Sequence, residues 1–202
     1  MQIIGITGPS GSGKSVVSKY LTSRKINVID ADTIYHGIIS PPSDCLDELV
    51  KHFGKGIVNG AGFLNRSALS QIVFGEENKD KLELLNQITH KYIVAKIKKL
   101  ITRFKLLGEE ICAIDAPLLI EAGLCSDCDF IITVLADKEI RAQRISERDK
   151  IDLDSALARI SSQKPDEFYI NASDYVLYNN HGVEELEKAL NEILTERGVA
   201  IF

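Results

Sequence analysis

The amino-acid sequence predicts an α/β fold in which a five-stranded, mostly parallel sheet is flanked by helices. Three observations lead to this prediction. The apolar segment Gln2–Thr7 is followed by a glycine-rich turn, an amphipathic segment and a second apolar segment, which is the pattern of a βαβ unit. Short apolar segments alternate with helical ones again after residue 108. The 202 residues are 45% hydrophobic and 26% charged, a size and composition that fit one compact chain with a sizeable core.

The elements follow from local patterns along the chain. Apolar runs bounded by turn residues predict strands at residues 2–7, 26–29, 110–115, 130–136 and 175–178. Apolar residues at helical spacing, such as Val16, Val17, Tyr20 and Leu21, predict helices. These helices are residues 14–23, 44–53, 67–74, 79–107, 138–148, 152–163 and 184–196, and residues from about 34 to 108 are mostly helical.

Charge and composition narrow the classes of function. The 24 basic and 29 acidic side chains give a net charge of −5, which argues against binding nucleic acid or an anionic membrane through bulk electrostatics. The chain has no run of 18 apolar residues and no signal-peptide pattern at its N-terminus, so we expect a cytoplasmic protein without nucleic-acid or membrane partners. The four cysteines are then reduced, and the Cys125–Cys128 spacing is most simply incidental. A monomer is the default oligomeric state.

The segment Gly8-Pro9-Ser10-Gly11-Ser12-Gly13-Lys14-Ser15 matches the pattern G-x-x-x-x-G-K-[ST] in full. Glycines let successive backbone N–H groups point at phosphate oxygens, and the following helix adds its positive N-terminal end. Lys14 is expected to reach the β- and γ-phosphates, and the Ser15 hydroxyl to bind Mg²⁺. The alternative is a glycine-rich turn that binds nothing, which the strand before the loop and the helix after it make less attractive.

Carboxylates follow two of the predicted strands. Asp30 and Asp32 are two residues apart on what we expect to be extended chain, so their side chains should project to the same side. One of them is suited to accept the proton of an attacking hydroxyl, and the other to hold water or metal. The alternative is that the pair caps the next helix. Asp115 ends the apolar strand 110–115, where proteins with this loop place an acid near Mg²⁺.

Arg141, Arg144 and Arg148 fall within roughly a 60° arc of one predicted helix. A cationic helix that closes over phosphates would supply charge in the transition state and exclude water. The alternative is a solvated face whose arginines pair with neighbouring acids. Those acids are Glu139, Glu147 and Asp149.

Three segments, Gly8–Ser15, Val28–Asp32 and Asp115–Glu121, occur in an order that resembles the dephospho-coenzyme A kinase family. Shorter fragments at 72–74, 85–90, 143–149 and 173–179 agree, so the resemblance covers nearly all of residues 1–195. It implies ATP-dependent phosphorylation of the ribose 3′-hydroxyl of dephospho-coenzyme A, the last step of coenzyme A synthesis, with ATP and Mg²⁺ as cofactors. The sequence departs from the family's usual residues at Lys91, Ile120 and Tyr169.

The resemblance also implies an organisation and a set of site residues. It implies a P-loop kinase fold with a nucleotide-binding core at about 1–35, 108–137 and 173–202, a helical substrate subdomain at about 36–107 and a helical lid at about 138–165. The catalytic residues would be Asp32 as base, Lys14 and Arg144. The ATP-binding residues would be Gly8, Gly11, Ser12, Gly13, Lys14, Ser15, Val16, Arg144 and Asn179. The substrate-binding residues would be Asp32, His90, Asp115 and Leu118, and Mg²⁺ would be held by Ser15 with Asp30 or Asp115 through water. For His90 and Asn179, purely structural roles are equally open.

Two other functions remain as alternatives. Another P-loop kinase, acting on a nucleoside monophosphate or a sugar acid, would share the loop and the lid but not the two aspartate-containing segments. A nucleotide-dependent switch would use the loop without an acceptor. Guanine-nucleotide switches usually carry the pattern Asn-Lys-x-Asp. The segment Asn78-Lys79-Asp80-Lys81 has lysine in place of the final aspartate, which disfavours a GTPase.

Overall fold

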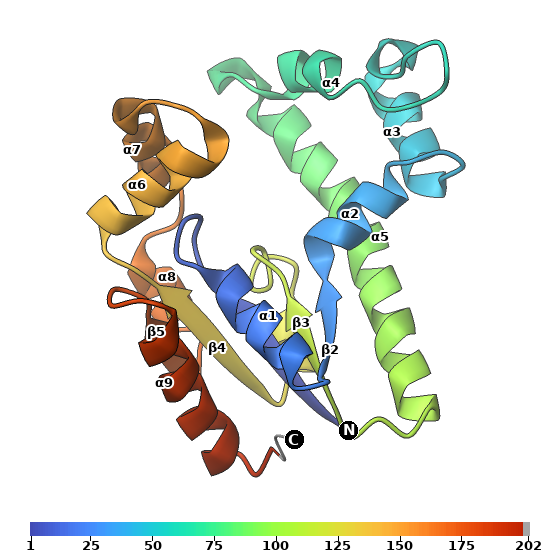
Figure 1. Ribbon diagram of the computed structural model, residues 1–202. Helices are drawn as coiled ribbons and strands as arrows, with labels where there is room; N and C mark the ends of the chain where they lie inside the picture. The colour runs from blue at the N-terminus through green and yellow to red at the C-terminus, as the bar shows by residue number, and fades with distance from the viewer. Residues whose placement is uncertain (200–202) are drawn as a thin grey trace. The chain divides into compact units, whose positions relative to one another are not determined.

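The computed structural model describes residues 1–199, apart from the side chain of Glu76, and divides into two units (Figure 1). The first unit contains Met1–Ile29 and the chain from Arg103 onward, and the second contains Asp30–Thr102. The sequence prediction put the borders of the helical subdomain near residues 36 and 107. The division falls earlier at both places, because the second unit begins where strand β2 gives way to a helix and ends inside the long helix α5.

The predicted α/β fold with a parallel sheet is confirmed. The five-stranded sheet has the order β2-β3-β1-β4-β5, and β1 pairs in parallel with β3 and β4, as β4 does with β5. The strands are β1 (Gln2–Thr7), β2 (Asn27–Asp30), β3 (Ile111–Asp115), β4 (Phe130–Leu135) and β5 (Tyr175–Tyr178). Every residue of β4 is buried, as expected for a parallel strand covered on both faces, and this explains its continuous apolar sequence.

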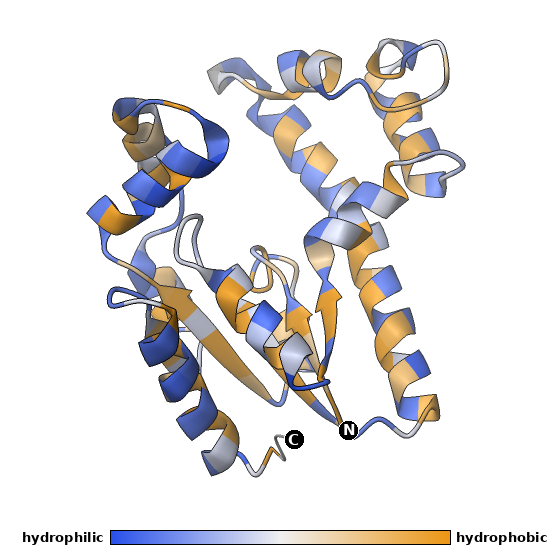
Figure 2. Cartoon of the chain, in the orientation of Figure 1, coloured by the Kyte–Doolittle hydropathy of each residue, from blue (hydrophilic) through white to orange (hydrophobic). Residues whose placement is uncertain are grey.

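The core of the first unit lies where α1 (Lys14–Ser23) and α9 (Val183–Glu196) pack against the sheet. Ile4, Ile132 and Leu190 are fully buried there. Figure 2 shows that hydrophobic residues predominate along the sheet and hydrophilic residues along α6 (Lys138–Asp149). This unit also contains α7 (Leu153–Ser161) and α8 (Asp166–Ile170), of which α8 was not predicted because five residues are too few for a periodic pattern.

Helices α6 and α7 form a hairpin with a small core of its own. Ala142 and Ile145 of α6 pack with Ala156 and Ile160 of α7. Asp152 caps α7 by accepting a hydrogen bond of 2.7 Å from the Ser155 N–H group. The chain reverses direction before α7 because Lys150 adopts a left-handed conformation.

The second unit is helical, as predicted. It contains α2 (Ala31–Ile38), α3 (Asp44–Phe53), α4 (Arg66–Val73), most of α5 (Lys79–Leu106) and two short 3₁₀ turns, η1 (Lys55–Ile57) and η2 (Glu76–Asn78). Its separate core includes Leu49, Ile57, Leu69 and Ile88. In the part of the chain that the structure describes, no helix is long and apolar enough to cross a membrane.

The expectation that Asp30 and Asp32 lie on extended chain was wrong. Only Asp30 is extended, and Asp32 is the second residue of α2. The Asp30 carboxylate caps this helix by accepting hydrogen bonds from the N–H groups of Asp32 (2.8 Å) and Thr33 (3.0 Å). The chain turns at this point because a capping aspartate satisfies amides that the first turn of a helix leaves unbonded. The two side chains therefore do not share one side of an extended chain.

Candidate active site

The loop between β1 and α1 has a backbone shape that requires glycine. Gly8 and Gly13 have φ angles of 146° and 94°. A Cβ atom would lie 2.2 Å from the Val134 carbonyl oxygen at Gly8 and 1.9 Å from Asn179 Nδ2 at Gly13. Helix α1 starts at Lys14 without a side-chain cap, so the N-terminal end of the helix is available to an anion.

Lys14 is held at the end of β3. Its Nζ atom forms an ion pair with Asp115 Oδ1, and the Ser18 hydroxyl donates a hydrogen bond to Asp115 Oδ2. The side chains of Lys14 and Asp115 are only 16% and 9% exposed. Because β1 and β3 pair with Ile6 opposite Asp115, the carboxylate lies beside the strand that leads into the loop. The pair keeps a cation next to the loop, where a phosphate would need it.

Arg144 and Asn179 also contact the loop. Arg144 Nη1 donates hydrogen bonds of 3.3 Å to the carbonyl oxygens of Gly11 and Ser12, and its Nη2 donates one of 3.0 Å to the Asn179 carbonyl oxygen. Asn179, which directly follows β5 and is 3% exposed, donates from Nδ2 to the Ser12 carbonyl oxygen at 2.9 Å. The two predicted ATP-binding residues that are far from the loop in sequence, Arg144 and Asn179, are thus brought to it by the tertiary structure.

The residues of the loop fit a bound phosphate chain. Within residues 1–199, the Ser12 hydroxyl is one of the buried polar side-chain groups without a hydrogen-bond partner. An oxygen acceptor beside the loop would satisfy this hydroxyl. Ser15 is exposed on the first turn of α1, and Val16 packs against the core below it. No cluster of three His, Cys, Asp or Glu side chains suited to a metal exists among the described residues. Mg²⁺ in proteins usually keeps several waters and is bound through one or two carboxylates together with substrate phosphates.

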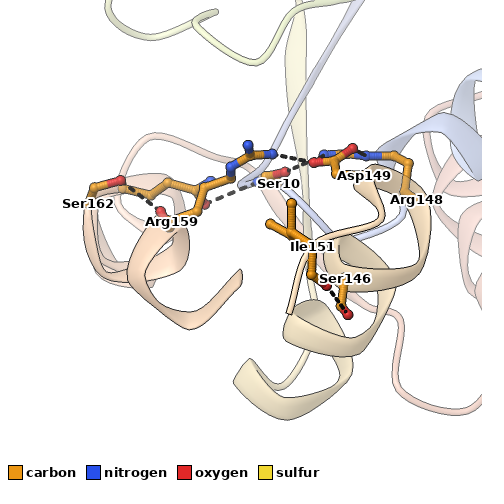
Figure 3. A network of polar contacts seen from close by, with 8 residues as sticks. Ser10, Ser146, Arg148, Asp149, Ile151, Arg159 and Ser162 are labelled. Atoms are coloured by element: carbon orange, nitrogen blue, oxygen red, sulfur yellow. Dashed lines mark hydrogen bonds and ion pairs between the residues drawn. The ribbon is translucent and has the colours of Figure 1, made fainter. Parts of the chain in front are cut away.

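The three arginines of α6 have different environments. Arg141 is 4% exposed and lies inside a network of hydrogen bonds, whereas Arg148 is largely exposed. Arg148 donates to both Asp149 oxygens, at 2.8 and 3.0 Å, and to the Ser10 hydroxyl at 3.2 Å (Figure 3). Arg159 of α7 also pairs with Asp149, and these guanidinium groups, Arg148 first, hold the pKa of that carboxyl below its usual value. Of the three arginines, Arg148 therefore matches the alternative interpretation of this helix, in which a solvent-exposed arginine pairs with a neighbouring acid.

The remaining predicted residues lie elsewhere. Asp32 is exposed in the first turn of α2, and Asp30 is occupied as the cap of that helix. His90 is half-buried on α5, and Leu118, in the turn after β3, is 44% exposed. Next to His90, Lys91 forms an ion pair of 2.6 Å with Glu48.

Sequence reasoning missed Ser18, which bonds to the predicted site residue Asp115, and also Gln163 and Asp166, which bond to Arg141. A signal existed for Ser18 alone, because it follows Lys14 by four residues and so lies on the same side of α1. The cysteines are free, and burial raises the pKa of Cys128 to about 12, which makes its thiol a poor ligand or nucleophile.

A glycine-rich loop after the first strand of a parallel sheet, a lysine at its end and arginines on a neighbouring helix define a kinase of the P-loop class. The family model for dephospho-CoA kinase matches residues 2–185, and the chain belongs to the dephospho-CoA kinase family. This confirms the family predicted from the sequence. The family catalyses the final step of coenzyme A biosynthesis.

Individual relatives agree with this assignment. A dephospho-CoA kinase of Fusobacterium nucleatum is 40% identical over 93% of this chain and 94% of its own length. One of Listeria innocua is 38% identical over 95% of this chain and 94% of its own length. The solved dephospho-CoA kinase of Campylobacter jejuni is 26% identical, with a TM-score of 0.71 over 97% of both chains. A shikimate kinase of Acinetobacter baumannii, 15% identical over 97% of this chain and 94% of its own with a TM-score of 0.52, shares the fold alone.

Proposed function

We propose that this protein transfers the γ-phosphoryl group of ATP to the ribose 3′-hydroxyl of dephospho-coenzyme A, giving coenzyme A and ADP. The observation that carries the proposal is Lys14, which lies at the N-terminus of α1 in contact with Asp115 at the end of β3. This arrangement occurs in a chain that matches the dephospho-CoA kinase family over nearly its whole length.

The loop residues would hold the donor. The N–H groups at the start of α1 would bind phosphate oxygens, and Lys14 would exchange its contact with Asp115 for one with the β- and γ-phosphates. Arg144 and Asn179 contact the same loop and would contribute from the side of α6 and β5. The Ser15 hydroxyl would bind Mg²⁺, with Asp30 or Asp115 acting through water. When bound, Mg²⁺ neutralises charge on the phosphate oxygens.

Asp32 would act as the base. It is exposed in the first turn of α2, directly after the carboxyl end of β2, and the carboxyl ends of parallel strands are where such sheets bind ligands. The 3′-oxygen forms a bond to the γ-phosphorus while the bond to the β–γ bridging oxygen breaks, and ADP leaves. Because this transition state is loose, the hydroxyl proton passes to the carboxylate late, and a base of ordinary strength suffices. His90 and Leu118 would contact the acceptor, and residues 138–165 would form a lid.

The proposal is tested by the choice of acceptor. Purified protein is incubated with Mg²⁺ and ATP, and with dephospho-coenzyme A or one of a panel of nucleoside monophosphates. We expect ADP to form in proportion to phosphorylated dephospho-coenzyme A and little to form with the other acceptors. Preferred phosphorylation of a nucleoside monophosphate would identify a different kinase. Release of ADP and free phosphate without any acceptor would instead indicate a nucleotide-dependent switch.

The base assignment is tested by Asp32→Asn, which keeps the shape of the side chain and removes its charge. General-base contributions are typically about 10²–10⁴-fold, so turnover should fall by that amount with little change in ATP affinity. Asp30→Asn is the matched control, because asparagine caps a helix nearly as well as aspartate. It should leave turnover much higher and show its effect in the dependence on Mg²⁺ concentration. Near-normal turnover of Asp32→Asn would contradict the base assignment.

A further inference from the structure

Arg141 is buried beside the phosphate loop, although nothing in the proposed chemistry uses it. It is 4% exposed, while the other residues of α6 are mainly polar, and most of them are exposed or half-buried. Burial lowers the pKa of Arg141, with the charge of Asp166 acting in the opposite direction. Arginine keeps its proton in proteins, so Arg141 holds a full positive charge in a largely dry environment. Burying such a charge is unfavourable unless the N–H donors of the guanidinium group form hydrogen bonds.

The donors of Arg141 are used on three segments of the chain. Its Nε atom donates to the Ser10 carbonyl oxygen at 3.1 Å, Nη1 to Asp166 Oδ1 at 3.2 Å, and Nη2 to Gln163 Oε1 at 2.7 Å. Gln163 lies just after α7, and Asp166 begins α8. A planar guanidinium group directs several donors at fixed angles, which a lysine ammonium group cannot reproduce.

The tip of the loop is held from both sides by this network. While the Ser10 carbonyl oxygen accepts from Arg141, the Ser10 N–H group donates to Gln163 Oε1 at 3.2 Å. The same Gln163 oxygen accepts from Arg141, so the three residues form a closed ring of hydrogen bonds.

A close backbone contact independently points to the same place. A Cβ atom at Gly11 would lie 2.7 Å from the Arg141 carbonyl oxygen and 3.0 Å from its Cα atom. The tip of the loop therefore packs directly on the first turn of α6, where Arg141 lies.

We infer that Arg141 and Gln163 are positioning residues, which hold Ser10 and Gly11 in the shape that binds phosphate and so set the affinity for ATP. The inference rests on the proposed function in taking ATP as the ligand of the loop. The ring fixes the loop before ATP arrives, so ATP does not have to order it, and a preorganised site binds more tightly. The effect falls on binding, because the Arg141 donors are already engaged with protein groups. Arg144 differs because it is only half-buried, and it donates to oxygens of the loop and of Asn179 from a position where we propose that it contacts the phosphates.

The test measures ATP binding without an acceptor. Isothermal titration calorimetry with Mg²⁺ and a non-hydrolysable ATP analogue is applied to Arg141→Lys, Gln163→Met and Gln163→Glu. Gln143→Met is the matched control, because Gln143 is an exposed glutamine on α6 whose side chain donates to Glu147 at 3.0 Å. Hydrogen bonds to charged groups are strong enough that their loss should raise Kd about tenfold in Arg141→Lys and Gln163→Met. Gln163→Glu keeps an oxygen that accepts from both Ser10 and Arg141, so it should bind the analogue nearly as the wild type does.

Steady-state kinetics separate positioning from simple stabilisation. Arg141→Lys and Gln163→Met should raise KM for ATP and leave kcat at saturating ATP close to that of the wild type. Wild-type Kd values for both, or an equal loss in Gln163→Glu and Gln163→Met, would overturn the inference. If Arg141→Lys does not fold, the two Gln163 variants decide the question. A wild-type protein that binds the analogue but does not phosphorylate dephospho-coenzyme A contradicts the proposed acceptor alone, whereas one that binds no ATP overturns both proposals.

Discussion

The sheet of the first unit and the α6–α7 hairpin are stabilised by different kinds of contact. The sheet is held by a continuous apolar core, in which residues such as Ile132 and Val134 are fully buried between helices. The hairpin has a small core centred on Ile145, and its arginines reach the loop through hydrogen bonds to carbonyl and hydroxyl oxygens.

The difference indicates which part of the site is fixed and which part responds to nucleotide. Phosphate oxygens do not compete with apolar packing, so the end of β3 that carries Asp115 should keep its backbone shape when ATP binds, while the Lys14 side chain turns to the phosphates. They do compete for the guanidinium donors of Arg144 and Arg148, which are less buried than Arg141, since hydrogen bonds from arginine to phosphate are strong and frequently bidentate. We therefore expect the hairpin to open and close more readily than the sheet.

Among substitutions next to the sheet, Lys14→Ala should have the largest effect on turnover. Removing a donor that stabilises the transferring group typically lowers turnover by about 10²–10³-fold. Turnover is measured with ATP and dephospho-coenzyme A, and circular dichroism confirms that the variant is folded. Lys19→Ala removes an exposed lysine from the same helix and should leave turnover unchanged. If Lys14→Ala kept near-wild-type turnover, the role of the loop in phosphoryl transfer would be wrong.

The difference in packing between the sheet and the hairpin can be tested by one substitution in each core, Ile132→Ala in the sheet and Ile145→Ala in the hairpin. Both side chains are fully buried, and truncating such a residue to alanine typically costs about 2–5 kcal/mol. Ile132→Ala should lower the free energy of global unfolding in urea. Ile145→Ala should instead increase hydrogen exchange mainly in residues of α6 and α7, because the hairpin opens as a local unit. Equal losses of global stability in the two variants would show that the hairpin and the sheet unfold together.

A smaller effect is expected for Arg144→Ala. Turnover should fall by about 10- to 100-fold, the range expected when hydrogen bonds to a charged group are lost. ATP affinity should fall less, because the charge is needed most when the phosphoryl group is in transit. Arg144→Lys keeps the charge and should recover part of the turnover. A loss of ATP affinity as large as the loss of turnover would assign Arg144 to binding alone, as we infer for Arg141.

The smallest effect concerns Asp149, whose pKa is lowered chiefly by its hydrogen bond with Arg148. A lowered pKa means that this carboxylate stabilises the folded hairpin above the usual aspartate pKa of about 4, and that the contribution is lost as the pH falls below it. Hydrogen exchange of α6 and α7, corrected for its intrinsic pH dependence, should therefore be slightly faster in Asp149→Asn at neutral pH. The difference from the wild type should vanish in acid. Asp154→Asn, an exposed aspartate of α7, is the control, and an equal effect there would show a general charge effect.

Local sequence patterns were sufficient to predict most of the elements. Helices α1 and α3 and strands β1 and β5 have the predicted bounds, because each has a clear apolar period and ends at turn or capping residues. The main local failure was Asp30–Asp32, where an aspartate that follows a strand fits both an extended turn and a helix cap.

The sequence by itself determined the parallel α/β fold, the phosphate loop and the family, because these depend on short segments whose chemistry is local. The partners of the site residues were decided only by the tertiary structure. Lys14 bonds to Asp115 across 101 residues, and Arg141 bonds to Ser10 across 131. The same helical spacing places Arg141, Arg144 and Arg148 on one predicted face, yet one is buried and another largely exposed. Helical periodicity specifies the direction of a side chain around the helix axis, whereas burial depends on what packs against that side chain. All three arginines reach the loop, but Arg141 is also covered by Gln163 and Asp166.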